Sequence, residues 1–180
     1  MLRFSIVFVV ILVTLFAAEL TEPVQTAVVI PWTEALVHIC VGLITLFDSH
    51  VAVYGKILQS TTNGFAISIE AGCNGIEAAI ILIAAMLAFP APWKHRVVGI
   101  LAGLCAVQAL NIVRVISLFY IGQWSPKAFE WAHLYLWQAL IMLDVLIVWL
   151  IWIRSLPRSA ASSGTPTPPS ADTGAQQAAA

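Results

Sequence analysis

The sequence predicts an all-α integral membrane protein with about four transmembrane helices, one interfacial or re-entrant helix and a short extracytoplasmic β-hairpin. Hydrophobic residues fill 61% of the 180 positions and charged residues only 9%, whereas a soluble domain usually carries about 25% charged residues. The apolar residues gather in segments close to the ~20 residues that a bilayer requires. This composition predicts the lipid bilayer as a partner. The net charge of −1, without a basic stripe, gives no indication of nucleic acid binding.

Four apolar segments are predicted to span the membrane: residues 4–20, 74–90, 97–121 and 131–153. The first follows Arg3 and ends in small residues, so a cleaved signal peptide is the alternative interpretation. The later spans favour an uncleaved first helix.

The distribution of cations predicts the topology. Lys94 and Arg96 lie between the second and third spans, and Arg154 and Arg158 follow the last one. The positive-inside rule places both regions in the cytoplasm, together with the N-terminus at Arg3. The segment from 48 to 73 and the loop at 122–130 then lie outside.

A fifth apolar segment, at 32–47, is predicted to be interfacial or re-entrant. It is short and carries Glu34 and His38. A start inside and position 48 outside require an odd number of crossings, so only one of the first two apolar segments spans. The alternative keeps both as spans and places the N-terminus outside, against Arg3.

Residues 50–70 differ from the helical segments. Two runs rich in β-branched residues, 51–58 and 65–70, flank the turn signal Thr-Thr-Asn-Gly at 61–64. This pattern predicts a hairpin just before Cys73. The end of the chain, 155–180, is rich in Pro, Ser, Thr, Ala and Gln and is predicted to be a disordered cytoplasmic tail, while 1–154 form the membrane-embedded domain.

Cys73 is the strongest candidate for a reactive group. It precedes an apolar segment and is predicted to lie in the first turn of a membrane helix, where free N–H groups and the helix dipole favour a thiolate. The chain has three cysteines with no CxxC pair and no zinc spacing, so no metal or cofactor is expected. Cys105 is predicted to be buried in mid-span.

Two further groups are predicted to lie in the same layer as Cys73. Arg114 is in the outer half of the next span, and inserting a cation there costs at least about 2.5–3.5 kcal/mol, so it should face the bundle interior. Asn111 shares its helix face. His133 opens the last span at its outer end. Thiol, imidazole and guanidinium together are the parts of an acyl-transfer site.

Each of these groups also has a purely structural interpretation. Arg114 could pair with Glu77 or Asp144 and only lock the bundle, and His133 could be a solvated interfacial residue. Glu77 lies four residues after Cys73, on the same helix face. Since an ionised carboxylate would raise the pKa of the thiol, Glu77 is expected to pair with Arg114 or to be neutral.

At these residues the chain resembles the exosortase/archaeosortase family over about residues 30 to 153. The resemblance rests on Gly-Cys-Asn-Gly at 72–75, Asn-Ile-Val-Arg at 111–114, and His133. It implies a membrane cysteine protease or transpeptidase in which Cys73 is the nucleophile, Arg114 stabilises the oxyanion and His133 shuttles the proton. Asn111, Asn74 and Glu77 would support them.

Three departures from the family pattern point to a branch within it. Asn74 stands where Ser is commonest, Glu77 lies where a basic residue is frequent, and the chain is short. These features resemble the compact branch of exosortase H. Its substrates carry a C-terminal signal of the IPTL-CTERM type, which is a short motif, a membrane helix and a basic tail.

The resemblance also implies a location and a binding groove. The enzyme would lie in the bacterial cytoplasmic (inner) membrane with its site facing the extracytoplasmic side. Gly99, Ala102 and Gly103 are expected to let the membrane helix of the substrate approach closely.

Three other classes remain open. A thiol oxidoreductase would need Cys40 as the partner of Cys73. A transporter or proton-relay protein would use Glu77, Arg114 and Asp144. A non-catalytic scaffold would tolerate the loss of all the candidate residues.

Overall fold

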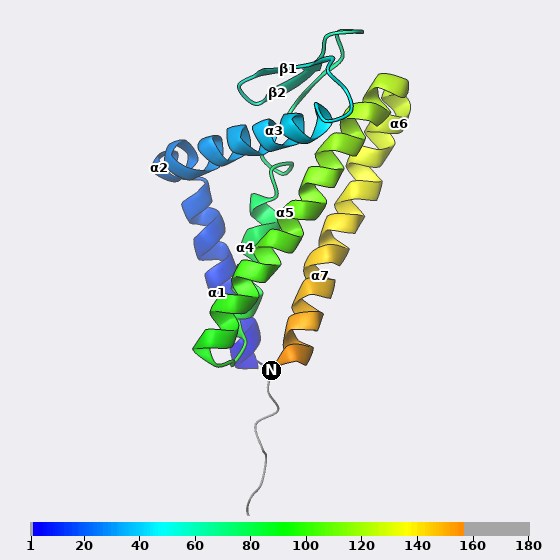
Figure 1. Cartoon of the computed structure of the whole chain (residues 1–180). Coiled ribbons are helices and arrows are strands. Elements are labelled where there is room, and N and C mark those ends of the chain that lie inside the picture. The colour runs from blue at the N-terminus through cyan, green and yellow to red at the C-terminus, as the bar shows by residue number, and fades with distance from the viewer. Residues whose placement is uncertain (1, 157–180) are drawn as a thin grey trace, which may run out of the picture.

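The computed structural model describes residues 2–156 (Figure 1). The tail predicted to be disordered lies largely outside these residues. The elements in chain order are α1 (Leu2–Glu19), α2 (Glu22–Val24), the π-helical turn η1 (Gln25–Val29), α3 (Ile30–Ile44), β1 (Val51–Tyr54), β2 (Ile57–Ser60), β3 (Ala66–Ser68), α4 (Ile76–Ala88), α5 (Trp93–Trp124), α6 (Pro126–Trp131), the π-helical turn η2 (Ala132–Leu136) and α7 (Trp137–Ser155).

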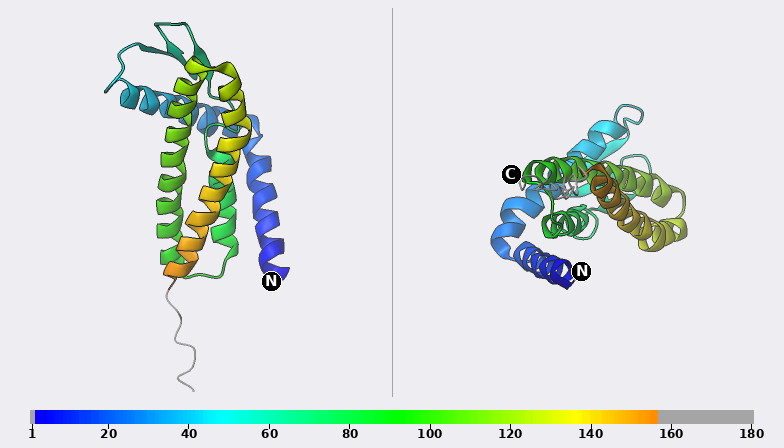
Figure 2. Two further views of the ribbon diagram at one scale, coloured as in Figure 1. Left: turned by 90° about the vertical axis from the view of Figure 1, so that its right-hand side faces the viewer. Right: turned by 90° about the horizontal axis from the view of Figure 1, so that it is seen from below.

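Four helices form a bundle that a fifth crosses at one end. α1 packs against α4, and α5 packs against both α4 and α7. α3 runs across the end of this bundle, with the sheet beyond it (Figures 1 and 2). The orientation of α3 is that of the predicted interfacial helix, although Glu22–Ile44 is also long and apolar enough to cross a membrane.

Four helical segments of the described chain meet the length and composition needed to cross a membrane: Leu2–Glu19, Glu22–Ile44, Trp93–Trp124 and Pro126–Ser155. The predicted span at 74–90 is shorter than expected, because its helix covers only the 13 residues Ile76–Ala88. Gly75 adopts a left-handed φ of 77° before the helix, and Phe89 is extended after it, ahead of Pro90.

Four cations near helix ends lie at one end of the bundle, whereas Lys127 in α6 and Lys56 beside β2 lie at the other. The start of α1, the α4–α5 connection and the end of α7 lie together, away from α3 and the sheet (Figure 1). These segments carry Arg3, Lys94, Arg96 and Arg154. This is the grouping that the positive-inside rule requires of a cytoplasmic face.

The predicted hairpin is a three-stranded antiparallel sheet in the order β1-β2-β3. The prediction treated 51–58 as one strand, but Tyr54 pairs with Ile57 across a two-residue turn. Gly55, with a φ of 58°, allows this turn. The turn predicted at 61–64 does connect two strands, β2 and β3.

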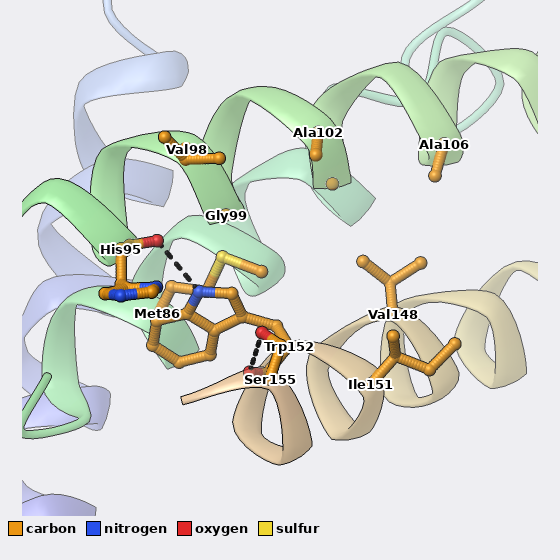
Figure 3. A pocket seen from close by; sticks show the side chains of 11 residues that line it. Met86, His95, Val98, Gly99, Ala102, Ala106, Val148, Ile151, Trp152 and Ser155 are labelled. Carbon is orange, nitrogen blue, oxygen red and sulfur yellow. Dashed lines mark hydrogen bonds between the residues drawn. The ribbon is translucent and has the colours of Figure 1, made fainter. Parts of the chain in front are cut away.

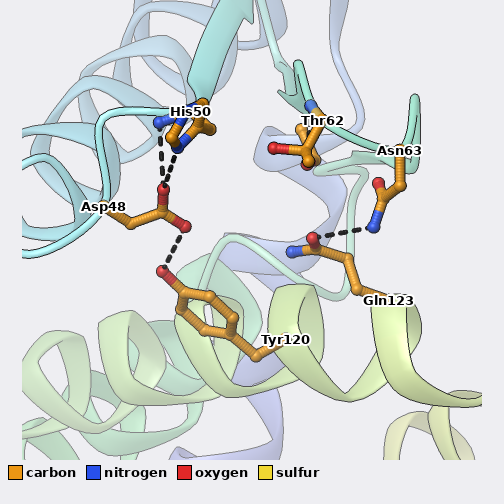
Figure 4. Close-up of polar contacts among 7 residues, drawn as sticks. Asp48, His50, Thr62, Asn63, Tyr120 and Gln123 are labelled. Atoms are coloured by element: carbon orange, nitrogen blue, oxygen red, sulfur yellow. Dashed lines mark hydrogen bonds and ion pairs between the residues drawn. The ribbon is translucent and has the colours of Figure 1, made fainter.

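The sheet is fixed to the end of α5 near α3, which we call the outer end; the opposite end, with Lys94 and Arg96, is the inner end. The Tyr120 hydroxyl donates to Asp48 (3.2 Å), and the Asn63 amide donates to Gln123 (3.0 Å) (Figure 4). The ring of Phe65 lies over Gly122, where an added Cβ would come within 2.0 Å of it. Polar and close apolar contacts therefore hold β3 in place against the bundle.

The inner half of α5 packs closely against α4 and α7. A Cβ at Gly99 would lie 2.0 Å from the Trp152 ring nitrogen, and one at Gly103 would lie 2.6 Å from Leu82. The Trp152 N–H donates to the carbonyl of His95 (3.0 Å; Figure 3). The close approach that Gly99 and Gly103 allow is therefore to α7 and α4 of the same chain. Ala102 is exposed beside them, and the binding of a substrate helix at this face stays a prediction.

A cavity of about 330 Å³ remains next to this packed region. Its lining comes from α4, α5 and α7 at the inner end of the bundle: Met86, His95, Val98, Gly99, Ala102, Gly103, Ala106, Val148, Ile151, Trp152 and Ser155. Figure 3 shows Ala102 and Ala106 on α5 facing Val148 and Ile151 on α7. This cavity is not the one that contains Cys73.

Candidate active site

Cys73 lies in the loop before α4, two residues ahead of the N-cap residue Gly75. The prediction of a thiol in the first helical turn is wrong by three residues, since the helix begins at Ile76. Gly72 and Gly75 have φ values of 82° and 77°, a conformation that residues with a Cβ rarely adopt. The two glycines thus bend the chain so that Cys73 turns toward α5 and η2.

Asn74 ties this loop to α3. Its side chain is fully buried and donates to the Thr33 hydroxyl (3.2 Å), and it accepts a hydrogen bond from the Ile76 N–H (3.1 Å). The Asn74 carbonyl accepts from the Trp32 ring N–H (3.2 Å). Asn74 therefore satisfies a free donor at the start of α4 and fixes the position of the neighbouring thiol.

Arg114 is directed at the Cys73 loop. It is only 3% exposed, and its Nη2 lies 3.6 Å from Cys73 Sγ while its Nη1 donates to the Gly72 carbonyl (3.3 Å). Within residues 2–156 it forms no ion pair with Glu77 or Asp144. The positive charge that is expensive to bury thus faces the thiol and not a carboxylate.

His133 completes the cluster from η2. Its Nε2 lies 4.0 Å from Cys73 Sγ. The residue belongs to the π-helical turn η2, a deviation that often marks functional positions in helices. The imidazole stacks on Phe129, with ring centroids 5.6 Å apart and planes 3° apart.

The second ring nitrogen of His133 is buried, and in the described chain no group accepts or donates a hydrogen bond there. A carboxylate commonly orients a catalytic histidine through that nitrogen. Here the Phe129 ring supplies the contact that fixes the imidazole plane. The sequence interpretation did not select Phe129, although its position four residues before His133 places it on the same helix face.

The nearby charges shift the pKa of the Cys73 thiol in opposite directions. Burial raises the pKa of the Cys73 thiol above its usual range, Arg114 lowers it, and Glu77 and Glu70 raise it further. The Glu77 carboxylate accepts a hydrogen bond from the Gly72 N–H. It forms no ion pair with Arg114 in the described chain, so the first of the two predicted alternatives is wrong. The pKa of the thiol stays raised in balance, and His133 Nε2, 4.0 Å from the sulfur, is the group placed to accept its proton.

Asn111 and Gln108 lie below the loop on α5. Gln108 donates to the Gly75 carbonyl (3.3 Å). Asn111 is fully buried, and neither polar atom of its side chain has a hydrogen-bond partner in the described chain. An added Cβ at Gly75 would lie within 3.1 Å of both amides, so only glycine allows α4 to begin this close to α5.

A cavity of about 400 Å³ gives access to Cys73 and His133. Three parts of the chain line it, namely β3 with its flanks, the Cys73 loop, and α6 with η2: Phe65, Ala66, Ile67, Ser68, Glu70, Ala71, Cys73, Phe129 and His133. Its size and its open wall suit a short length of peptide.

The residues that a thiol oxidoreductase or a proton-relay protein would need do not form a cluster like that of Cys73, Arg114 and His133. Cys40 is buried and lies in the apolar cluster on which Cys73 packs, but the two thiols are free. Cys105 is exposed on α5, where burial was expected. The Asp144 carboxylate has a buried oxygen with no partner in the described chain, and no contact joins it to Arg114. No group of three metal-binding side chains occurs among residues 2–156.

Comparison with known proteins identifies the family. The family model of the transmembrane exosortases (Exosortase_EpsH) matches residues 1–153. Neither the curated proteins nor the solved structures gave a match. The match covers the bundle, α3, the sheet and the Cys73–Arg114–His133 cluster. The chain is therefore a multi-pass membrane protein that belongs to the transmembrane exosortase family, a family of membrane cysteine peptidases and transpeptidases.

Proposed function

We propose that this protein is a membrane cysteine protease or transpeptidase that cleaves the C-terminal sorting signal of exported proteins and transfers or releases them. One observation supports this most strongly: the Cys73 thiol lies 4.0 Å from the His133 imidazole and 3.6 Å from the Arg114 guanidinium. The same thiol lines an open cavity beside the sheet.

The reaction has two steps. Cys73 Sγ attacks the scissile carbonyl carbon while its proton passes to His133 Nε2, and a C–S bond forms. The tetrahedral intermediate collapses, the C–N bond breaks, and His133 returns the proton to the leaving amine. An amine acceptor or water then attacks the thioester, and the thiol recovers its proton through His133.

Arg114 stabilises the negative charge that develops on the carbonyl oxygen. Its Nη2 is already within 3.6 Å of the sulfur, so the oxygen of the attacked carbonyl would lie within reach of the guanidinium. Its Nη1 is held by the Gly72 carbonyl, which keeps the group oriented before substrate binds. Asn74 and Asn111 are positioning residues in this scheme.

The substrate is proposed to be a protein that ends in a short motif, a membrane helix and a basic tail. Two adjoining cavities support a place for that helix. One, lined in part by Gly72, Glu77, Arg114 and Gln138, shares Ile81 and Met142 with an apolar groove between α1, α4 and α7. This path runs from the active-site loop toward the inner end of the bundle.

The proposed location is the bacterial inner membrane, with the site on the extracytoplasmic side. The clustering of Arg3, Lys94 and Arg154 at the opposite end of the bundle supports this orientation. A substrate with a basic tail in the cytoplasm would then present its motif at the level of Cys73.

The test is to co-express the protein with a tagged exported reporter that ends in an IPTL-type motif, an apolar helix and a basic tail. Cys73→Ala is expected to abolish cleavage while the protein still inserts and accumulates. Cys105→Ala, at an exposed thiol on α5, is the matched control and should cleave normally. Normal cleavage by Cys73→Ala would exclude the cysteine-nucleophile mechanism.

A further inference from the structure

Strand β3 has a free edge beside the thiol. Among residues 2–156 the sheet order is β1-β2-β3, so β3 has a neighbouring strand on one side only. Ala66 and Ser68 on this strand line the same cavity of about 400 Å³ as Cys73 and His133. An unpaired strand edge therefore lies next to the group that would attack a peptide bond.

The register shows which backbone groups of β3 are free. The Ile69 N–H donates to the Lys56 carbonyl across the β2–β3 pair (3.0 Å). Hydrogen-bonded positions alternate along an antiparallel strand, so Ile67 is also bonded toward β2. Ala66 and Ser68 then direct their N–H and C=O groups to the outer edge, two residues apart.

This edge is little protected against strand pairing, since β3 itself contains no lysine or proline, although the Ser68 hydroxyl donates to Glu70 (2.8 Å), which forms an ion pair with Lys56. Edge strands are commonly protected by lysine, proline or a covering segment. Ala66 and Ser68 are small and exposed, and proline is absent from β3. A second backbone can therefore approach the edge closely.

The edge is also fixed in position. Ile69 is 2% exposed and packs in the cluster that contains Cys40 and Val115. The hydrogen bond between Asn63 and Gln123 holds the preceding turn on α5 (Figure 4). β3 is therefore held at a fixed position relative to Cys73, which lies five residues after the end of the strand at Ser68.

We propose that the extended segment of the substrate just ahead of its membrane helix binds by pairing with β3 as a further strand of the sheet. Ala66 and Ser68 would exchange main-chain hydrogen bonds with it, while Phe65 and Phe129, 6.2 Å apart and edge to face, form part of the wall for its side chains. The inference rests on the proposed function and names how that site selects an extended peptide.

Ser68→Pro tests the pairing, because proline removes the outward N–H and is tolerated at an edge strand. Ser68→Ala is the matched control, since it retains that N–H. Ser68→Pro is expected to lower reporter cleavage about tenfold, as the loss of a hydrogen bond and of close pairing would predict. Ser68→Ala should cleave normally, and iodoacetamide should alkylate Cys73 equally in both variants. Cleavage by Ser68→Pro at the rate of the unaltered protein would overturn the proposal.

Disulfide cross-linking provides a second measurement that does not depend on turnover. Ala66→Cys is placed in a protein that also carries Cys73→Ala and Cys105→Ala, and the reporter receives one cysteine in its motif. A disulfide should form under mild oxidation at 66, while Tyr54→Cys on β1 should give none. Equal cross-linking at both positions, or none at 66, contradicts strand pairing. A reporter that the unaltered protein leaves uncut would contradict the proposed function, whereas the cross-link would still report where the peptide binds.

Discussion

The two halves of α5 face the bundle interior in different ways. In the inner half, Gly99 and Gly103 are covered by Trp152 and Leu82, and the Trp152 N–H has a partner in the His95 carbonyl. In the outer half, Arg114 is equally buried but points at a thiol, and its Nε has no partner in the described chain.

The difference separates packing from chemistry on one helix. Small residues in the inner half allow close contact between helices of the same chain, which stabilises the bundle. The outer half leaves buried polar atoms on Asn111 and Arg114 without partners among the described residues, and His133 in η2 has one as well. Arg96 Nε in the inner half also lacks a partner, so the contrast lies in the neighbours: only Arg114 has the Cys73 thiol beside it. Each unpaired buried atom costs stability. Such a cost is expected where the missing partners come from a substrate.

Among the substitutions that test this difference between the two halves of α5, Arg114→Lys should lower reporter cleavage the most. Lysine is a point charge and does not reproduce the planar fork that contacts both Gly72 and Cys73. Reporter cleavage is expected to fall about 100-fold, the usual loss for one oxyanion donor. The control is Arg96→Lys in the inner half, where the guanidinium donates to the Phe89 carbonyl and lies over the Trp93 ring, far from the thiol. Full cleavage by Arg114→Lys would mean that charge alone is needed.

Gly99→Ala should affect stability and not turnover. The added methyl group would overlap the Trp152 ring, and overpacking of this kind costs about 1–3 kcal/mol. Thermal unfolding in detergent should occur at a lower temperature, with cleavage per folded molecule unchanged. Gly42→Ala on α3 is the control, because nothing lies within 4 Å of its added Cβ. A loss of turnover with unchanged stability would link the inner half to catalysis.

Glu77→Gln should have the smallest effect, on the pH dependence of the thiol. Because Glu77 contributes to the raised pKa of Cys73, removing its charge should lower that pKa. Alkylation of Cys73 by iodoacetamide rises with pH up to the thiol pKa, so the variant should react severalfold faster at pH 7 to 9. Glu34→Gln, on the exposed side of α3, should leave the rate unchanged. A slower reaction in Glu77→Gln would mean that the Gly72 contact dominates.

Several parts of this molecule could be predicted from sequence because lipid constrains them strongly. Apolar length predicted the helical bundle and the helix that lies across its end before the sheet. The positive-inside rule predicted that Arg3, Lys94, Arg96 and Arg154 share one end. The burial of Arg114 followed from the cost of a cation within a membrane helix. The proximity of Cys73, Arg114 and His133 followed from their positions at the same ends of neighbouring helices.

Other parts could not be predicted, because they depend on single backbone angles or on contacts distant in sequence. Gly55 divides an apparent strand by adopting a positive φ. Gly75 delays the start of α4, which removes Cys73 from the helical turn. Gly99 packs against Trp152, 53 residues later, and no local pattern indicates that contact.

The short α4 sets a depth for the reaction. Its 13 residues rise only about 20 Å, whereas the hydrocarbon layer is about 30 Å thick. If α4 ends at the cytoplasmic boundary with its neighbours, the Cys73 loop lies roughly 10 Å short of the outer boundary. A peptide bond could then be cut without withdrawing the substrate from the bilayer.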